Sequence, residues 1–506
     1  MELLFQQFLK ASEKTPEKTA IWCDGETRTY AEMRRLICCF ANYLTSKGVK
    51  RNDIIGIPMT NCIESVALIF AASALGAGLA PINPTVPAAA ADLAFKSAGV
   101  THVIARKAFY RSAEKEWTDK TKGCRLCLDG AYEDLDTMED VLNAPDTFPT
   151  PENVTGDEPL ILTLTSGSTG EPKPIVLTQN NKIKRADAHI RLYGLTENDS
   201  VLAATPLYQS LAERLVIMPL LIGGTSVLLP RFTPVIWLKC VRDQAVTFTI
   251  AVSAQLGQIA QLLSSPYTPE ISSLRCVVSS SALLEPHVRR ELIEKLECDF
   301  HEMYGTSECS TVTDIGFKET GAKIRSVGRP LPGVSIRILG DDGSEKPTGE
   351  IGEITVRTPL QCAGYYRMEE KTKEAFSGEY FKTGDLGRLD EDGYLYFAGR
   401  KKEIIITGGV NVYPKDVEDK ITELDGVQEC ASFAYPDERL GEVVAVAVVP
   451  KPGAELTRKK LQLYCARNLA DFQQPHKIFL VQDLPRNAMG KVVKMKLNEH
   501  VAGMEG

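Results

Sequence analysis

Segments with a helical spacing of apolar residues alternate with short β-branched or apolar runs through most of the first 300 residues. A helix is predicted over residues 30–45, because Thr29 can cap its start and Gly48 can end it. The short runs predict strands at residues 54–59, 102–105, 160–165, 226–229, 247–252 and 275–279. Helix-length segments, such as 237–245 and 285–296, separate several of these runs. The alternation predicts βα units with mostly parallel strands in a layered α/β fold.

The pattern changes after about Gly328, where short strands and Gly/Asp turns predict a small β-rich subdomain. From Lys401 onward a compact α+β segment follows, with helices predicted at 415–424 and 458–469 and strands at 431–435 and 443–449. We therefore predict a large layered amino-terminal domain over residues 1–400, built of two α/β subdomains and the β-rich one. A small α+β domain is predicted over residues 401–506.

Charge and composition narrow the classes of function. The chain of 506 residues has 58 Lys and Arg against 66 Asp and Glu, a formal net charge of −8. With 43% apolar and 25% charged residues, it is not disordered, collagen-like or a coiled coil as a whole. The acidic excess argues against a broad nucleic-acid surface, which needs clustered basic residues. Any anionic ligand must therefore be held locally.

The cysteines and apolar segments indicate a compartment. Thirteen cysteines are scattered mostly singly, which is typical of reduced, buried thiols in a cytosol-like environment. Cys124 and Cys127 have CxxC spacing without a second pair of ligands, so we expect no metal there. The amino terminus lacks the pattern of a signal peptide, and the uncharged residues 66–82 predict a buried helix running into a strand. We expect a cytoplasmic protein without a membrane span.

A loop rich in glycine and hydroxyl residues carries the first candidate chemistry. It follows a predicted strand and precedes a helix-length run, and its candidate anion-binding residues are Thr165, Ser166, Gly167, Ser168, Thr169, Gly170 and Lys173. Small residues let backbone N–H groups face an anion, and a lysine adds a point charge. The loop is not a Walker A motif, which needs Gly-Lys adjacent. A flexible surface turn is the alternative.

Four further motifs follow this loop in order along the chain. They are Tyr304-Gly-Thr-Ser-Glu308, Tyr380-Phe-Lys-Thr-Gly-Asp385 with Gly399-Arg400, Gly408-Gly409-Val-Asn-Val-Tyr-Pro414, and Leu484-Pro-Arg-Asn-Ala-Met-Gly-Lys491. Together with the loop, they make nearly the whole chain resemble the adenylate-forming superfamily of acyl- and aryl-CoA synthetases, luciferases and peptide-synthetase adenylation domains. In appearance it is most similar to stand-alone acyl- or aryl-CoA ligases.

The resemblance implies ATP-dependent conversion of a carboxylic acid to an acyl-adenylate, with release of pyrophosphate, followed by thioester formation with CoA. The attack joins two anions, so cationic and hydrogen-bonding groups must neutralise them. By resemblance, Lys491 bridges the carboxylate and the α-phosphate. Glu308 is the expected ligand of Mg²⁺, a cation that prefers oxygen. Ser307 stands where the family usually has threonine, and its hydroxyl can bond a phosphate oxygen.

The same resemblance implies a site for the nucleoside of ATP. Tyr304 is expected to stack on adenine, although an isolated tyrosine beside glycine is more often core packing. Ser281 and Ala282 are expected to form the wall of the adenine site. Asp385 offers two oxygens to the ribose hydroxyls, and Arg400 adds a donor near the same sugar.

The pocket for the carboxylic acid is predicted both from residues that match the family pattern and from residues that differ from it. Its expected residues are Tyr208, Gln209, Ser253, Ser280 and Gly305. Gln209 is neutral where amino-acid adenylating domains commonly have aspartate, so the counter-ion for an α-ammonium group is missing and an amino acid substrate is disfavoured. The serines at 279–281, in place of a common Gly-Gly-Ala stretch, favour a substituted aryl or oxygenated short acid.

A catalytic lysine on a separate domain implies domain movement. In similar enzymes the small domain swings after adenylation, and Gly408 and Gly409 then line a thiol tunnel. The family hinge corresponds to Lys402, whose polar neighbours tolerate large changes in backbone dihedral angles.

The sequence leaves alternatives for the acceptor of the acyl group and for the class of function. Free CoA is favoured, and the phosphopantetheine of a carrier protein is the second possibility. A non-catalytic nucleotide-binding scaffold is a third, although the catalytic residues are all present. We expect the ligands to be a small carboxylic acid, ATP, Mg²⁺ and CoA, with no nucleic acid and no membrane span, in a monomer or homodimer.

Overall fold

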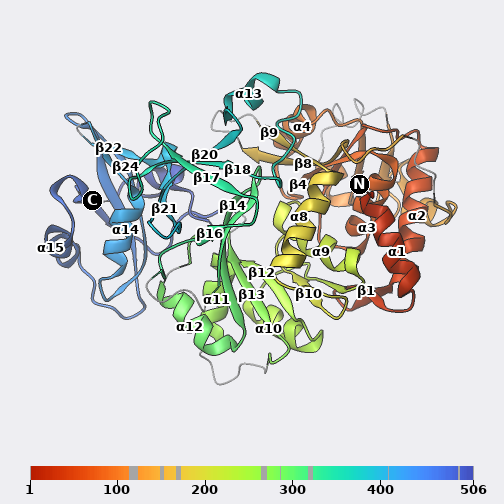
Figure 1. The fold of residues 1–506 in the computed structure, drawn as a ribbon, viewed down its shortest axis with the longest axis horizontal. Helices are drawn as coiled ribbons and strands as arrows, with labels where there is room; N and C mark the ends of the chain where they lie inside the picture. The colour runs from red at the N-terminus through yellow and green to blue at the C-terminus, as the bar shows by residue number, and fades with distance from the viewer. Residues whose placement is uncertain are drawn as a thin grey trace. The chain divides into compact units, whose positions relative to one another are not determined.

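The computed structural model describes residues 2–112, 123–148, 153–166, 172–263, 271–284, 286–316, 323–407, 409–487 and 491–504. The chain forms two compact units, drawn from red at the amino terminus to blue at the carboxyl terminus in Figure 1. The first unit comprises Met1–Ser280, Leu284–Val312 and Thr358–Glu374. The second comprises Ser281–Leu283, Thr313–Arg357 and Ala375–Gly506.

The central strands of one sheet in the first unit are parallel. Its strands lie in the order β14 (Asp299–Thr306), β13 (Cys276–Ser280), β12 (Phe248–Val252), β10 (Ser200–Ala203), β11 (Thr225–Leu228), β1 (Thr19–Cys23) and β2 (Glu26–Thr29). Among these seven strands only β2 pairs antiparallel, with β1, and beyond β14 the same sheet continues through β15 (Ser310–Gly316) to β16 (Arg329–Pro330), which pair antiparallel with each other. Helices α10 (Pro234–Asp243), α11 (Ser253–Leu263) and α12 (Pro286–Leu296) accompany these strands. The fully buried Trp237 lies in the apolar core that these helices share with the sheet.

A second sheet of the first unit carries the predicted phosphate loop. Its strands lie in the order β7 (Asp136–Thr137), β6 (Arg125–Cys127), β5 (His102–Ala105), β3 (Ile54–Pro58), β4 (Gly78–Ile82), β8 (Pro159–Ser166) and β9 (Pro172–Thr178). All are parallel except β9, which pairs antiparallel with β8. The predicted strand–loop–helix context is therefore wrong, because strand β9 lies between the loop and the next helix.

Further helices are described in the first unit, and two of them follow the sequence signals. The further helices are α1 (Leu4–Lys14), α2 (Tyr30–Ser46), α3 (Ile63–Leu75), α4 (Ala88–Ser97), α5 (Lys107–Ser112), α7 (Met138–Leu142), α8 (Gln179–Leu192), α9 (Ser210–Ile222) and α13 (Glu369–Glu374). The Thr29 hydroxyl accepts from the Glu32 N–H at the start of α2, which confirms the predicted cap. Helix α3 is buried almost throughout and leads into β4, as predicted for residues 66–82.

The second unit contains two further sheets. The first has the order β17 (Ser335–Leu339), β18 (Gly352–Arg357), β20 (Tyr380–Leu389) and β19 (Phe376–Ser377), with β21 (Leu395–Arg400) also paired to β20. The other has the order β23 (Val410–Val412), β22 (Ile405–Thr407), β25 (Gly441–Pro450) and β24 (Val427–Asp437), with β26 (Lys477–Leu480) paired to β25. In addition, β15 (Ser310–Gly316) pairs with β16 (Arg329–Pro330) through Thr313 and Asp314.

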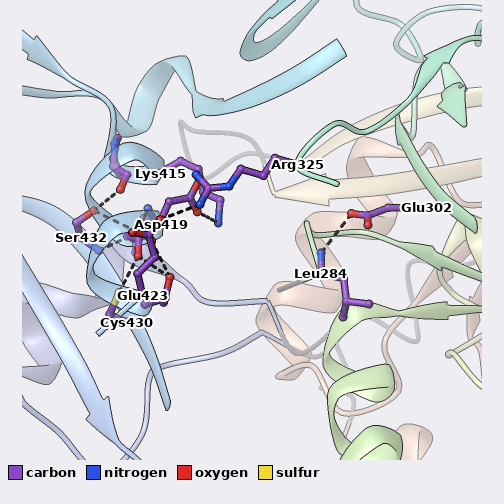
Figure 2. Close-up of polar contacts among 12 residues, drawn as sticks. Leu284, Glu302, Arg325, Lys415, Asp419, Glu423, Cys430 and Ser432 are labelled. Carbon is purple, nitrogen blue, oxygen red and sulfur yellow. Dashed lines mark hydrogen bonds and ion pairs between the residues drawn. The ribbon is translucent and has the colours of Figure 1, made fainter. Parts of the chain in front are cut away.

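Short helices complete the second unit. They are η2 (Lys401–Glu403), α14 (Pro414–Thr422), α15 (Arg458–Asn468), η3 (Asp471–Gln473), η4 (Lys494–Lys496) and α16 (Leu497–His500). Val417 and Ile421 of α14 and Leu461 of α15 share one buried core with strands β25 and β26. Immediately after α14, Glu423 forms an ion pair with Arg325, in which Arg325 Nη2 lies 2.8 Å from Glu423 Oε1 (Figure 2).

The structure confirms the predicted α/β class and most predicted elements. Strands β3, β5, β8, β11, β12 and β13 each lie within one residue of their predicted bounds. All thirteen cysteines carry free thiols, and all but Cys298 and Cys430 are buried, as their scattered spacing predicts. Within the described parts of the chain, none of the helices combines the length and apolar character needed to cross a bilayer.

Candidate active site

Four neighbouring strands of the first unit end at one edge of the parallel sheet, and most of the predicted pocket residues follow them. Tyr208 and Gln209 come after β10, Ser253 after β12, Ser280 ends β13, and Tyr304 and Gly305 lie near the end of β14. The carboxyl ends of parallel strands meet at the same edge, which is where α/β folds bind ligands. The fold therefore brings these predicted residues to one side of the sheet.

Backbone contacts fix the pocket segments at this edge. The Ser253 hydroxyl donates to the Ser280 carbonyl over 3.2 Å, so two predicted residues touch directly. The Asn61 amide donates to the Thr205 carbonyl over 2.9 Å and accepts from the Leu207 N–H over 2.7 Å. Asn61 lies 144 residues before Thr205 in the chain, and no local motif marks it. Sequence reasoning missed this residue for that reason.

Glu302 holds the segment that follows β13. Its side chain is buried on β14 and forms an ion pair with the buried Arg289 of α12. The same carboxylate accepts from the backbone N–H of Leu284 over 3.2 Å (Figure 2). Ser281 and Ala282 follow Ser280 directly and are exposed, and Ser281 has a φ of 78°, which is uncommon for a residue with a side chain.

The predicted metal-binding residue Glu308 lies in a tight turn after β14. A Cβ atom at Gly305 would lie 2.0 Å from the Ser310 carbonyl oxygen, so only glycine fits at the start of this turn. Ser307 and Glu308 are both half-buried. The Tyr365 hydroxyl donates to Glu308 Oε1 over 3.2 Å. Burial, together with the Glu308 carboxylate, raises the pKa of Tyr365, so the hydroxyl keeps the proton that it donates.

Tyr365 also connects Glu308 to the predicted phosphate loop. Lys173 Nζ lies 5.9 Å from the centre of the Tyr365 ring, and its strand position pairs with Thr165 across the hairpin. The predicted residues Gly167, Ser168, Thr169 and Gly170 lie outside the described residues, and for Thr165 and Ser166 only the backbone, at the end of β8, is described. The motifs did not reveal Tyr365, because it lies in a separate segment.

In the second unit, two predicted residues pair directly and a third interacts with them electrostatically. Asp385 on β20 and Arg400 on β21 are direct cross-strand partners, with Arg400 Nε 3.4 Å from Asp385 Oδ1. The charges that act on Lys491 include Arg400, Asp385 and Glu403. Burial, and then the Arg400 charge, lower the pKa of Lys491. Its backbone N–H donates to Asn487 Oδ1 over 3.0 Å, which holds the ends of the loop together.

The residues predicted to serve the moving domain lie in a short helix and at a turn. Lys402 is exposed within η2, and its neighbour Lys401 pairs with Asp341 at 2.8 Å and with Glu353 at 3.2 Å. Gly409 is exposed with a φ of 86°, at the turn between β22 and β23. Gly408 lies outside the described residues.

A buried charged network lies between helices α8 and α9 and the strand after the Glu308 turn. His189 is fully buried, its Nδ1–H donates to the Arg185 carbonyl over 2.8 Å, and its Nε2 accepts from Arg214 Nη1 over 2.9 Å. Arg214 Nη1 also donates to Thr311 Oγ1 over 3.3 Å. Burial, with the charges of Arg214 and Arg185, lowers the pKa of His189 well below its usual value, so the ring is neutral.

This neutral histidine predicts an acid-dependent loss of stability. Below about pH 6.5 the unfolded chain protonates His189 while the native state does not, so the free energy of unfolding falls as the pH falls. From pH 7.5 to pH 5 the loss due to this residue should be about 2 kcal/mol. In urea unfolding of His189→Gln, the free energy of unfolding should fall by about 2 kcal/mol less over this pH range than it does in the wild type. This difference does not depend on how much the substitution destabilises the protein at pH 7.5. His287→Gln, at an exposed position of α12, is the control, and equal slopes for the two variants would contradict the prediction.

Comparisons with known proteins agree on one class. The AMP-binding enzyme model matches residues 8–366, and the model of the AMP-binding enzyme C-terminal domain matches residues 416–491. Indoleacetate–CoA ligase from Aromatoleum aromaticum is 30% identical, with 96% of each chain covered. A 2-succinylbenzoate–CoA ligase from Bacillus cereus is 28% identical over 100% of both chains. The crystal structure of ATP-bound MatB from Rhodopseudomonas palustris is 28% identical, covers 100% of both chains and has a TM-score of 0.89.

Proposed function

Because the chain belongs to the AMP-binding enzyme family, we infer that it is an AMP-forming acid–thiol ligase. It activates a carboxylic acid with ATP to an acyl-adenylate, releases pyrophosphate and then transfers the acyl group to the thiol of CoA. The observation that carries this proposal is the grouping of Lys491 with Asp385 and Arg400 in the second unit. A half-buried ammonium that interacts with two proposed ribose-binding residues is suited to neutralise a carboxylate and an α-phosphate together.

The nucleotide is held by groups with separate tasks. The buried Asp385 accepts from the ribose hydroxyls, and Arg400, paired with it across the strands, donates to the same sugar. Tyr304, on β14, offers its ring to adenine. Lys173 and the N–H groups of the preceding loop bind the phosphates. Together these local donors offset the overall negative charge of the chain.

Glu308 would hold Mg²⁺ through carboxylate oxygens, a donor type that this cation prefers. The donor set fits, because the carboxylate is half-buried, is fixed in a tight turn and has one oxygen oriented by Tyr365. When bound, Mg²⁺ supplies charge neutralisation at the phosphates. Ser307 adds a hydroxyl donor to a phosphate oxygen from the same turn.

The acid is proposed to be a substituted aryl or oxygenated short acid. Ser253 and Ser280 give the pocket polar atoms, and Gln209 at the start of α9 is neutral. Two relatives support an aryl acid, since they are indoleacetate and 2-succinylbenzoate ligases by name. After adenylation, residues 401–506 are proposed to swing about Lys402, which withdraws Lys491 and brings Gly409 and Gly408 to line the path of the thiol.

The direct test is acid-dependent pyrophosphate release across aliphatic, aryl, dicarboxylic and amino acids. We expect the highest kcat/KM with an aryl acid that carries a polar substituent, and thioester formation with free CoA. Amino acids should be poor substrates because Gln209 supplies no counter-ion for an ammonium group. If adenylate forms but only a carrier protein accepts the acyl group, the acceptor is carrier phosphopantetheine rather than CoA. Pyrophosphate release that no acid stimulates would contradict the proposal.

A further inference from the structure

One buried arginine outside the predicted site binds the backbone of the Glu308 turn. Arg185 lies on α8 and is 2% exposed. Its guanidinium donates to the Glu308 carbonyl over 2.7 Å, to the Ser307 carbonyl over 3.0 Å and to the Leu360 carbonyl over 2.8 Å. These three acceptors belong to two segments that are about 50 residues apart in the chain. A planar guanidinium can satisfy several acceptors in fixed directions at once.

The two segments that Arg185 joins carry the proposed metal ligand and its hydrogen-bond donor. The Cys362 N–H donates to the Glu308 carbonyl over 2.7 Å, so this oxygen accepts from both Cys362 and Arg185. Three residues further along, Tyr365 donates to the Glu308 carboxylate. The Arg185 side chain therefore holds both the backbone of the turn and the segment that carries Tyr365.

The far end of the turn is tied to the same helix. Thr311 Oγ1 lies 2.9 Å from His189 Nε2, and His189 lies one turn after Arg185 on α8. Arg214 of α9 donates to both His189 and Thr311. Residues 307–311 are thus held at both ends by polar side chains of the helix pair. A turn held in this way has little freedom to move its carboxylate.

We propose that Arg185 is a positioning residue for adenylation, which sets the Glu308 carboxylate and the Ser307 hydroxyl for Mg²⁺ and the phosphates through the backbone of their turn. This inference rests on the proposed function of Glu308. Arg185 touches neither nucleotide nor metal in this role. The alternative is that Arg185 only stabilises the fold, as any well-bonded buried cation does.

Lys182 offers a matched control for that alternative. It lies one turn before Arg185 on α8, is equally buried, and forms an ion pair with the buried Glu213 of α9. None of the described contacts of Lys182 reaches the Glu308 turn. Lys182→Met therefore removes a buried cation from the same helix and leaves the turn in place. It should lower the Tm without changing the response to Mg²⁺.

The test titrates Mg²⁺ in two assays of the full-length protein, acid-dependent pyrophosphate release and ATP binding by calorimetry without acid. For Arg185→Met and Arg185→Lys we expect the Mg²⁺ midpoint to rise about tenfold in both assays, and kcat to fall about a hundredfold. Lysine at position 185 should not restore the wild-type Mg²⁺ midpoint, because a single ammonium cannot reach three carbonyls. Tyr365→Phe, which removes only one hydroxyl, should raise the midpoint with little change in Tm.

The outcomes separate the inference from the proposed function. If the wild-type protein shows no acid-dependent pyrophosphate release, the proposed function fails. If the wild type is active but the Arg185 variants keep its Mg²⁺ midpoint, or shift it no more than Lys182→Met does, the positioning role is overturned. If Arg185→Met fails to fold, Arg185→Lys and Tyr365→Phe still test the positioning role. An unchanged Mg²⁺ midpoint in both of these variants also overturns that role.

Discussion

Lys491→Ala is expected to lower the rate of acid-dependent pyrophosphate release at least about a thousandfold, the largest effect on activity that we predict. The attacking carboxylate and the α-phosphate are both anions, and the half-buried Lys491 ammonium interacts electrostatically with both Asp385 and Arg400. Alanine removes the one proposed cation that faces both anions at once. Because the proposed ribose and adenine contacts do not involve Lys491, the KM for ATP should change much less than kcat.

The half-reactions can be measured separately to check this. Pyrophosphate release should be lost in Lys491→Ala, while thioester formation from chemically made acyl-adenylate should stay within a few-fold of wild type. Lys494→Ala is the matched control, because Lys494 is a nearby lysine that pairs with Glu418. Equal losses in both half-reactions, or the same loss in both lysine variants, would contradict the assigned role.

The candidate motif residues could be recognised in the sequence because glycine, hydroxyl and charged residues combine there in distinctive short runs. The pairing of Asp385 with Arg400 needed the register of β20 and β21, which spacing alone does not define. Arg185 was missed for a physical reason. Its neighbours Lys182 and Lys184 make the segment look like a solvated basic face, and its acceptors are carbonyls more than 120 residues away. Carbonyl acceptors carry no side-chain signal.

The sequence of helix α8 nevertheless contains a pattern that could indicate a buried polar network. Lys182, Arg185 and His189 are spaced by three and four residues, so they share one face of the helix. The buried residues Ile183 and Ala186 lie beside them. A polar stripe adjacent to the apolar face of a helix indicates a buried network as well as a solvated surface. Only the distant partners, Glu213 and the Glu308 turn, decide between these two interpretations.

Glu302→Ala is expected to lower the free energy of unfolding by about 3–5 kcal/mol, the largest effect on stability that we predict. Glu302 and Arg289 are both almost fully buried, so removal of the carboxylate leaves a cation in the core of the first unit. The Leu284 N–H loses its acceptor as well (Figure 2). Urea unfolding near pH 7 measures the loss.

The double variant Glu302→Leu/Arg289→Met separates the charge from the packing. It removes both ions and keeps apolar volume, so it should recover most of the lost stability. The segment after β13 would still lack its anchor at Leu284, and the predicted adenine wall at Ser281 and Ala282 follows β13 in that segment. The double variant should therefore unfold like the wild type but bind ATP more weakly. If it bound ATP normally, Glu302 would serve the fold alone; if it remained as unstable as Glu302→Ala, burial of an unpaired charge would not be the cause.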